Sequence, residues 1–170
     1  MAHAFHIRPV STAEDLRATA DLFARYAASL PVDLSYQDFA SELEALPGKY
    51  APPRGALLLA RDADGAPLGC VGLRPISPKG VCEIKRLFLL PGARGLGLGR
   101  ALTEAVIEAA RRLGYQELRL DTLPTMEAAI GLYEQIGFRR IAPYYAPTPP
   151  GTIFMSLELS RHGGSWPAST

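Results

Sequence analysis

The sequence has little excess charge and lacks any long apolar run. Its formal net charge is +1 at pH 7, so the composition offers no broad basic surface for nucleic acid or for an anionic membrane. No segment approaches the roughly 18 consecutive apolar residues of a membrane-spanning helix. The first ten residues hold no apolar stretch of signal-peptide length. We therefore expect a cytoplasmic protein without nucleic-acid or membrane partners.

Cysteine and histidine are also scarce. The 2 cysteines are too few for a disulfide framework, and Cys70 and Cys82 lie within apolar segments, as reduced cytosolic thiols do. His3, His6 and His162 lie in the terminal segments, away from any metal-ligand spacing. The G-x-S-x-G pattern of a serine nucleophile elbow is missing as well. The scarcity of cysteine and histidine predicts a protein without a metal site, and the missing elbow predicts chemistry without a serine nucleophile of that kind.

Strand and helix patterns follow one another along the 170 residues. Ser11 and Glu14 have the spacing of a capping box before a helix that Pro31 ends. Strands are expected at residues 5–10, 56–60, 68–73, 81–90, 117–121, 138–141 and 152–159, and helical stripes at residues 16–27, 36–46, 102–113 and 129–136. This order predicts one α/β domain over residues 1–160, with a mixed sheet of about seven strands and about four helices on both faces. We expect a flexible tail at residues 161–170.

Three glycines alternate directly after a predicted strand and directly before a predicted helix. Gly95, Gly97 and Gly99 permit positive φ or a close backbone approach, and the free N–H groups of a helix start carry the positive end of its dipole. Arg94 and Arg100 flank the glycines and can add charge-assisted hydrogen bonds. The pattern predicts a cradle for a phosphate or pyrophosphate. A glycine-rich connecting turn is the alternative.

Two common phosphate-binding motifs do not fit this loop. A P-loop requires Gly-Lys followed by Ser or Thr, whereas Gly99 is followed by Arg100. The dinucleotide fingerprint G-x-G-x-x-G fails because its sixth position is Arg100 when counted from Gly95, and Leu102 when counted from Gly97. A nucleotide-binding protein is therefore the weaker hypothesis for this loop.

The strand before the glycine loop changes its pattern halfway. Cys82 and Ile84 are apolar residues at even-numbered positions, whereas Leu87 and Leu89 are apolar residues at odd-numbered positions. Because side chains of a regular strand alternate with a period of two, one inserted residue is needed to keep all four on one face. We therefore expect a β-bulge near residues 85–86. It would leave backbone groups free to pair with a ligand that carries amides.

Three stretches of the chain resemble the GCN5-related N-acetyltransferases, namely residues 82–91, 94–102 and 129–138. The likeness is specific between about residues 56 and 141. It implies a mostly antiparallel, twisted sheet with a parallel central pair. It also implies acetyl-coenzyme A (acetyl-CoA) as donor and direct transfer of the acetyl group to an amine in a ternary complex. Met126 departs from the pattern, because many members have an asparagine there that makes a polar contact with the cofactor.

The resemblance further implies how the cofactor is held. The backbone of the bulged strand pairs with pantetheine, and the glycine loop binds pyrophosphate. The expected cofactor contacts are Leu87, Phe88, Leu89, Arg94, Gly95, Leu96, Gly97, Leu98, Gly99, Arg100, Met126 and Ala129.

Acyl transfer to an amine needs a neutral amine, donors for the oxyanion and a proton for the departing thiolate. Tyr133 matches the family position whose phenol protonates the sulfur, although its spacing also suits a core residue. Glu83 is the candidate base, because it is a lone carboxylate in an apolar strand. A salt-bridged Glu83, with proton removal through waters, is the alternative. The N–H of Leu89, just past the expected bulge, is the candidate oxyanion donor.

The acceptor is expected to lie against the first two helices and the last loop. Tyrosines with arginines suit a small amine that carries a carboxylate, such as an amino acid, although the aromatic residues also suit core packing. The candidate acceptor residues are Tyr36, Phe39, Arg74, Lys85, Arg86, Tyr144 and Tyr145. Two further hypotheses are a protein or peptide N-acetyltransferase and a coenzyme A-binding module without turnover. A homodimer is a hypothesis from general prevalence alone.

Overall fold

The computed structural model describes residues 4–159, apart from the side chain of Tyr36. The expected tail at residues 161–170, as well as His3 and His162, therefore lies outside the described residues. The α-helices are α1 (Ala13–Ser29), α2 (Phe39–Glu44), α3 (Leu98–Arg112) and α4 (Glu127–Ile136). Three short 3₁₀ helices are η1 (Leu34–Gln37), η2 (Gly48–Tyr50) and η3 (Pro91–Ala93). The strands are β1 (Phe5–Pro9), β2 (Ala56–Asp62), β3 (Pro67–Ile76), β4 (Val81–Leu89), β5 (Glu117–Thr122), β6 (Arg139–Ile141) and β7 (Ile153–Glu158).

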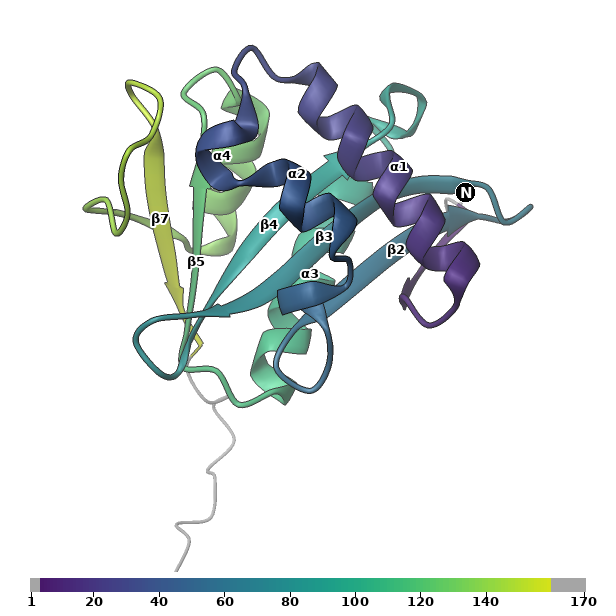
Figure 1. The fold of residues 1–170 in the computed structure, drawn as a ribbon, viewed down its shortest axis with the longest axis horizontal. Coiled ribbons are helices and arrows are strands. Elements are labelled where there is room, and N and C mark those ends of the chain that lie inside the picture. Colours follow the sequence, from purple (N-terminus) through teal and green to yellow (C-terminus); the bar gives the residue numbers. More distant parts are fainter. Residues whose placement is uncertain (1–3, 160–170) are drawn as a thin grey trace, which may run out of the picture.

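One sheet organises the described chain, and its strand order is β1-β2-β3-β4-β5-β7-β6. All neighbouring strands in it are antiparallel except β4 and β5, which are parallel. In Figure 1, α1 and α2 cover one face of the sheet, whereas α3 and α4 lie behind it. The predicted α/β class, the seven strands in residues 4–159 and the parallel central pair are confirmed.

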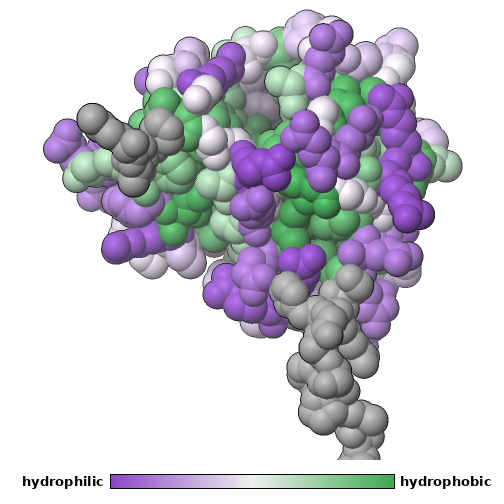
Figure 2. Space-filling view, turned by 180° about the vertical axis from the view of Figure 1, so that it is seen from behind, coloured by the Kyte–Doolittle hydropathy of each residue, from purple (hydrophilic) through white to green (hydrophobic). Residues whose placement is uncertain are grey.

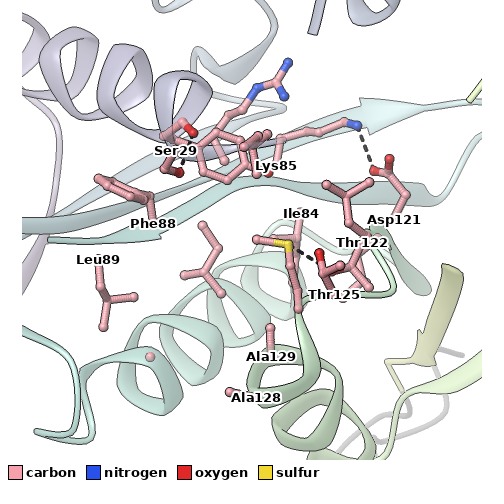
Figure 3. A pocket seen from close by; sticks show the side chains of 18 of the residues that line it. Ser29, Ile84, Lys85, Phe88, Leu89, Asp121, Thr122, Thr125, Ala128 and Ala129 are labelled. Atoms are coloured by element: carbon pink, nitrogen blue, oxygen red, sulfur yellow. Dashed lines mark hydrogen bonds and ion pairs between the residues drawn. The ribbon is translucent and has the colours of Figure 1, made fainter. Parts of the chain in front are cut away.

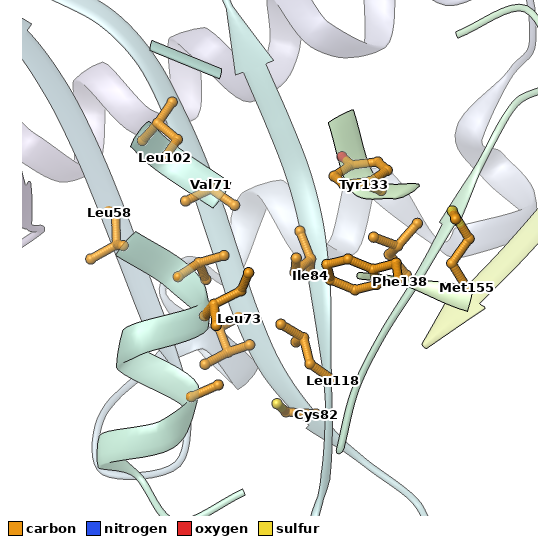
Figure 4. Close-up of a cluster of buried hydrophobic side chains, with 14 of the residues drawn as sticks. Leu58, Val71, Leu73, Cys82, Ile84, Leu102, Leu118, Tyr133, Phe138 and Met155 are labelled. Carbon is orange, nitrogen blue, oxygen red and sulfur yellow. The ribbon is translucent and has the colours of Figure 1, made fainter. Parts of the chain in front are cut away.

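Each face of the sheet has its own hydrophobic core. Behind the sheet, Leu102 and Leu118 are fully buried and pack with Tyr133 and Phe138 (Figure 4). In front, Phe23 anchors a smaller cluster beneath α1. On the face that carries α3 and α4, hydrophobic residues reach the surface between hydrophilic ones (Figure 2). None of the helices in residues 4–159 combines the length and apolarity that crossing a membrane requires.

The first helix begins one residue later than the sequence pattern predicted. Thr12, not Ser11, is the N-cap, and its hydroxyl accepts the N–H of Asp15 at 3.0 Å. The capping box is therefore Thr12 with Asp15, and the predicted pairing of Ser11 with Glu14 is wrong. Both pairs have capping-box spacing, but the Asp15 carboxylate also binds Arg61 of β2 at 2.8 Å. This ion pair with the sheet favours the capping box that begins at Thr12 over the one that begins at Ser11.

The second predicted helix is divided in two. Residues 34–37 form η1, and α2 begins only at Phe39. Between them Asp38 has φ = 56°, a left-handed conformation that a continuous helix cannot include. The segment from Leu34 to Glu44 is therefore a short, bent wall in front of the sheet. We call residues 34–44 the front wall.

The expected bulge lies in β4. Arg86 has φ = 59°, and the pairing with β3 jumps from Gly72 opposite Lys85 to Cys70 opposite Phe88. Two residues of β4 therefore face one residue of β3, which is the definition of a β-bulge. The bulge returns Leu87 and Leu89 to the rear core, so the interpretation of the parity change is confirmed.

Beyond the bulge, β4 separates from its parallel neighbour. Within the described chain, β4 pairs with β5 only at residues 81–83. Figure 1 shows the two strands diverging from that point toward their C-terminal ends. The sheet is therefore split into a V, and the edge of β4 that faces β5 has no strand partner beyond Glu83.

Candidate active site

A cavity of about 430 Å³ fills the V between β4 and β5. Figure 3 shows Phe88 and Leu89 on one side of it and Ala128 and Ala129 of α4 on the opposite side. The lining also includes the end of α1 and the front wall, so the cavity connects the two faces of the sheet. The polar and charged lining residues include Tyr26, Ser29, Gln37, Lys85, Arg86, Arg94, Asp121, Thr122, Thr125, Glu127 and Tyr133.

The glycine loop has the backbone of an anion cradle. Gly95 and Gly97 have φ = 82° and 80°, a conformation that residues with a Cβ rarely adopt. Among the described atoms, none lies within 4 Å of a Cβ placed at either position. Gly97 is the N-cap of α3 without a side-chain cap, so the first N–H groups of the helix are open. The loop therefore fits the pyrophosphate of a coenzyme A donor.

The two arginines beside the loop differ. Arg94 lines the cavity. Arg100 instead donates to Gln135 at 2.9 Å and to Glu104 at 3.4 Å on the outside of the helices. Leu98, which was expected at the cofactor, has a side chain in the rear core, so only its backbone can face a ligand.

The expected cofactor residues thus divide into two sets. Those that line the cavity are Leu87, Phe88, Leu89, Arg94, Gly99, Met126 and Ala129. Those that lie outside its lining are Gly95, Leu96, Gly97, Leu98 and Arg100. The second set belongs to the loop and the first turn of α3, where binding would use backbone N–H groups rather than side chains.

The backbone of β4 also presents a donor to the V. The N–H of Leu90 donates to the carbonyl of Leu68 in β3 at 2.9 Å. Successive N–H groups of an extended strand point to opposite edges. The N–H of Leu89 therefore points toward β5, where no strand pairs with it in the described structure.

Tyr133 lies on α4 with its side chain at the cavity, and only 5% of the residue is exposed. Its ring packs against Phe138, with 5.5 Å between centroids. Burial raises the pKa of the Tyr133 phenol well above its ordinary value, and nearby Tyr26 and Asp121 raise it further. The phenol is therefore protonated at neutral pH, as a proton donor must be.

Glu83 is buried but does not reach the cavity lining of the described structure. Its carboxylate accepts a hydrogen bond from Arg74 Nε at 3.0 Å and another from the Tyr144 hydroxyl. Lys85 Nζ lies 3.7 Å away. The structure thus gives Glu83 the salt-bridged environment that stood as the alternative to a catalytic role.

Asp121, at the end of β5, is a cavity residue that sequence reasoning missed. It accepts hydrogen bonds from Lys85 Nζ at 2.9 Å, from Gln37 Nε2 at 3.2 Å and from the Tyr145 hydroxyl. Burial favours the neutral acid, but the charge of Lys85 and the hydrogen bond from Tyr145 outweigh it, so the pKa of Asp121 lies below its ordinary value. Asp121 is therefore an ionised partner of Lys85 rather than a strong base.

Six charged side chains form what we call the charged network in front of the sheet. Its members are the cations Arg74, Lys85 and Arg86 and the carboxylates Glu42, Glu83 and Asp121. Phe39, Tyr144 and Tyr145, also expected at the acceptor, pack on or bond to its members. Of the seven expected acceptor residues, Lys85 and Arg86 line the cavity, and the side chain of Tyr36 lies outside the described part. Within residues 4–159, no cluster of His, Cys, Asp and Glu is arranged to hold a metal ion.

Comparison with known proteins identifies the class to which this site belongs. The model of the acetyltransferase (GNAT) family matches residues 19–138. An N-acetyltransferase of Schizosaccharomyces pombe is 39% identical over 155 residues, which cover 91% of this chain and 95% of that protein. The chain therefore belongs to the GNAT family and is an N-acetyltransferase.

Two further proteins bear on the site. The N-acetylaspartate synthetase of Danio rerio is 32% identical over 137 residues, which cover 79% of this chain and 49% of that longer protein. The structure of yncA from Salmonella typhimurium, solved with its cofactor acetyl-CoA, matches with a TM-score of 0.67 and 22% identity. The match covers 94% of this chain and 96% of that one. This likeness shows the shared fold.

Proposed function

We propose that this enzyme transfers an acetyl group from acetyl-CoA to the amine of a small molecule that also carries a carboxylate, such as an amino acid. One observation supports it above all: a single cavity joins Gly99 and Arg94, at the anion cradle, to Lys85 and Arg86 on the other face of the sheet. A donor entering over α3 and an acceptor entering past α1 would meet inside the V.

The cavity suits a carboxylate because it has cations at its front. The ammonium of Lys85, which is 4% exposed, hydrogen-bonds Asp121 at 2.9 Å and lies 3.7 Å from Glu83. An ammonium has three N–H groups, so a ligand carboxylate can share it with Asp121. A carboxylate placed there would gain charge-assisted hydrogen bonds. The name of the Danio rerio relative, N-acetylaspartate synthetase, supports an amino acid as acceptor.

Two groups of this chain would carry the chemistry, with water as the acceptor of the amine proton. When bound, acetyl-CoA supplies a thioester that an amine can attack. The N–H of Leu89 stabilises negative charge on the thioester oxygen, and the Tyr133 phenol gives its proton to the departing sulfur. We assign removal of the amine proton to water in the cavity, because Glu83 lies outside the cavity lining of the described structure and its carboxylate is bound by Arg74 and Tyr144. Direct proton removal by Glu83 is the competing assignment.

The same proposal includes the cellular compartment of the protein. Cys70 and Cys82 are both described, buried and unpaired, which supports a reducing compartment and hence the cytoplasm. That the enzyme forms a homodimer remains a prediction. Sedimentation velocity, which reports the mass of the particle in solution, tests it.

The experiment is a turnover assay with Tyr133→Phe. Purified enzyme is given acetyl-CoA with a panel of amino acids, other amines and short peptides, and thiol release is followed. We expect release with carboxylate-bearing amines, and about 10²–10⁴-fold slower turnover in the variant with unchanged acetyl-CoA affinity. Tyr115→Phe is the matched control, because its hydroxyl donates to Arg54 outside the cavity lining.

The other outcomes of the panel decide between the hypotheses. Turnover with peptides alone would make the enzyme a peptide N-acetyltransferase. Tight acetyl-CoA binding without turnover on any amine would indicate a binding module. Stronger stabilisation by ATP or NAD than by acetyl-CoA would indicate a nucleotide-binding protein.

A further inference from the structure

Arg86 occupies the bulge of β4 in a backbone conformation that favours glycine. Its φ of 59° lies in the left-handed region, which side chains with a Cβ adopt rarely unless the surroundings hold them there. The same residue marks the point where the pairing with β3 jumps. The backbone of Arg86 is therefore part of what separates β4 from β5 and opens the V.

The side chain of Arg86 reaches in the other direction, toward the front wall. Its Nε donates to Glu42 Oε2 at 2.9 Å, and its Nη2 to Glu42 Oε1 at 3.3 Å. Its Nη1 donates to Gln37 Oε1 at 2.7 Å. The guanidinium lies 5.1 Å from the ring centroid of Phe39 and 6.0 Å from that of Tyr26. Three of these four partners belong to the front wall.

The front wall depends on such contacts. In the described structure α2 has six residues and no buried side chain, and a helix that short is not stable by itself. Arg86, by contrast, is only 3% exposed, and its two-pronged pairing with Glu42 is removed from solvent. Removing one partner of a buried pair leaves the other charge uncompensated. The Arg86–Glu42 pair therefore links α2 to the sheet, beside the apolar contacts of Phe39 and Leu43 with the front core.

We propose that Arg86 is a positioning residue that couples the front wall to the V, so that binding of acetyl-CoA between β4 and β5 and ordering of residues 34–44 favour each other. This inference rests on the proposed function in one respect, that the V binds the donor. Coupling between two sites is reciprocal. An ordered front wall would therefore strengthen donor binding, and a bound donor would order the wall against which the acceptor lies.

The test separates the backbone of Arg86 from its side chain. Glycine accepts φ = 59° without strain, so Arg86→Gly keeps the bulge and removes the tether. Arg86→Val also removes the tether but opposes positive φ, because it is β-branched. In Arg86→Gly the Glu42 carboxylate keeps, among the described ion pairs, only its 3.8 Å contact with Arg74. The double variant Arg86→Gly with Glu42→Gln removes that poorly compensated charge, and it replaces Arg86→Gly if the single variant does not fold.

Amide hydrogen exchange at residues 39–44 is the readout, with and without saturating acetyl-CoA. No residue from 39 to 44 lines the cavity in the described structure, so direct contact with the donor does not protect them. In the wild type we expect acetyl-CoA to slow this exchange about 5-fold or more, within the range of coupling between sites. In Arg86→Gly we expect faster exchange that acetyl-CoA no longer slows, while the donor still binds.

Three outcomes would overturn the proposal. Protection of residues 39–44 by acetyl-CoA in Arg86→Gly, equal to that in the wild type, would show that Arg86 does not transmit it. Equal acetyl-CoA affinity of the Gly and Val variants would show that positive φ at Arg86 does not matter to the V. Absence of acetyl-CoA binding to the wild-type protein would overturn the proposed function itself, and the coupling with it.

Discussion

Gly97→Ala tests the anion cradle with a matched control in the same chain. Gly97 has φ = 80° and open space where a Cβ would lie. Gly65, in the turn between β2 and β3, has φ = 86° and equally open space, but it lies outside the cavity and the cradle. Both substitutions place a Cβ in a left-handed conformation, which costs about 1–2 kcal/mol. They therefore destabilise the free protein alike.

The ligand distinguishes the two variants. A loss of about 1–2 kcal/mol lowers the Tm by a few degrees, since about 2–4 °C corresponds to 1 kcal/mol in a protein of this size. Acetyl-CoA at 100 times its Kd stabilises the folded state by about 2.7 kcal/mol, which raises the Tm by roughly 5–11 °C. In Gly97→Ala the new methyl group would point into the open space where the proposed cradle holds the pyrophosphate, so this rise should disappear.

Thermal unfolding of both variants, with and without acetyl-CoA, is the assay. The account predicts equal Tm values for the two free variants, a full ligand-induced rise in Gly65→Ala and little or none in Gly97→Ala. If Gly97→Ala keeps the same rise as Gly65→Ala, the loop is a connecting turn, and the donor binds elsewhere.

Three further predictions follow from ionisable groups outside the cradle. Glu83→Gln should lower kcat less than Tyr133→Phe does and leave the pH profile of kcat unchanged; loss of the acidic limb of that profile would instead identify Glu83 as the base, because a base loses activity when it is protonated. Arg61 lowers the pKa of Asp15 from 3.8 to about 2, so Asp15 stabilises the fold fully above pH 3.8, and this contribution is lost as the pH falls through about 2. Asp15→Asn should therefore lower the Tm at pH 6, and the difference from the wild type should vanish near pH 2, where the wild-type carboxyl is itself protonated. Burial raises the pKa of Cys82 to about 12, so an aromatic disulfide reagent at pH 8 should titrate no thiol before unfolding, and fast reaction would contradict the burial.

Local patterns in the sequence were enough to predict the backbone geometry of the glycine loop and of the bulged strand β4. The alternation of Gly95, Gly97 and Gly99 predicted positive φ or a close backbone approach. Gly95 and Gly97 have positive φ, whereas Gly99 lies in the first turn of α3. The change of parity between Ile84 and Leu87 required an inserted residue, and the bulge lies at Arg86. These features depend on neighbours along the chain, so one sequence contains the information.

The acceptor half depended on contacts between distant segments, which no local pattern encodes. Asp121 meets Lys85 only because β5 lies beside β4, and Gln37 of the front wall hydrogen-bonds both Asp121 and Arg86. A lone carboxylate at a strand end was the one available signal for Asp121. The partner of Glu83, Tyr144, comes from the loop after β6, so its salt-bridged state could not be read from β4 alone.

The start of the first helix also depends on a contact between distant segments. Ser11 with Glu14 and Thr12 with Asp15 are equivalent as capping boxes in sequence. The contact of Asp15 with Arg61 of β2 distinguishes them, and that contact exists only in the folded sheet.

The central claim is that one cavity brings an acetyl-CoA donor to a carboxylate-bearing amine. The most direct measurement is product analysis by mass spectrometry after the enzyme is incubated with acetyl-CoA and a mixture of amino acids and matched amines without a carboxylate. We expect N-acetylated amino acids in amounts equal to the thiol released, with little product from the matched amines. Equal acetylation of both sets, or release of thiol without any acetylated product, would contradict it.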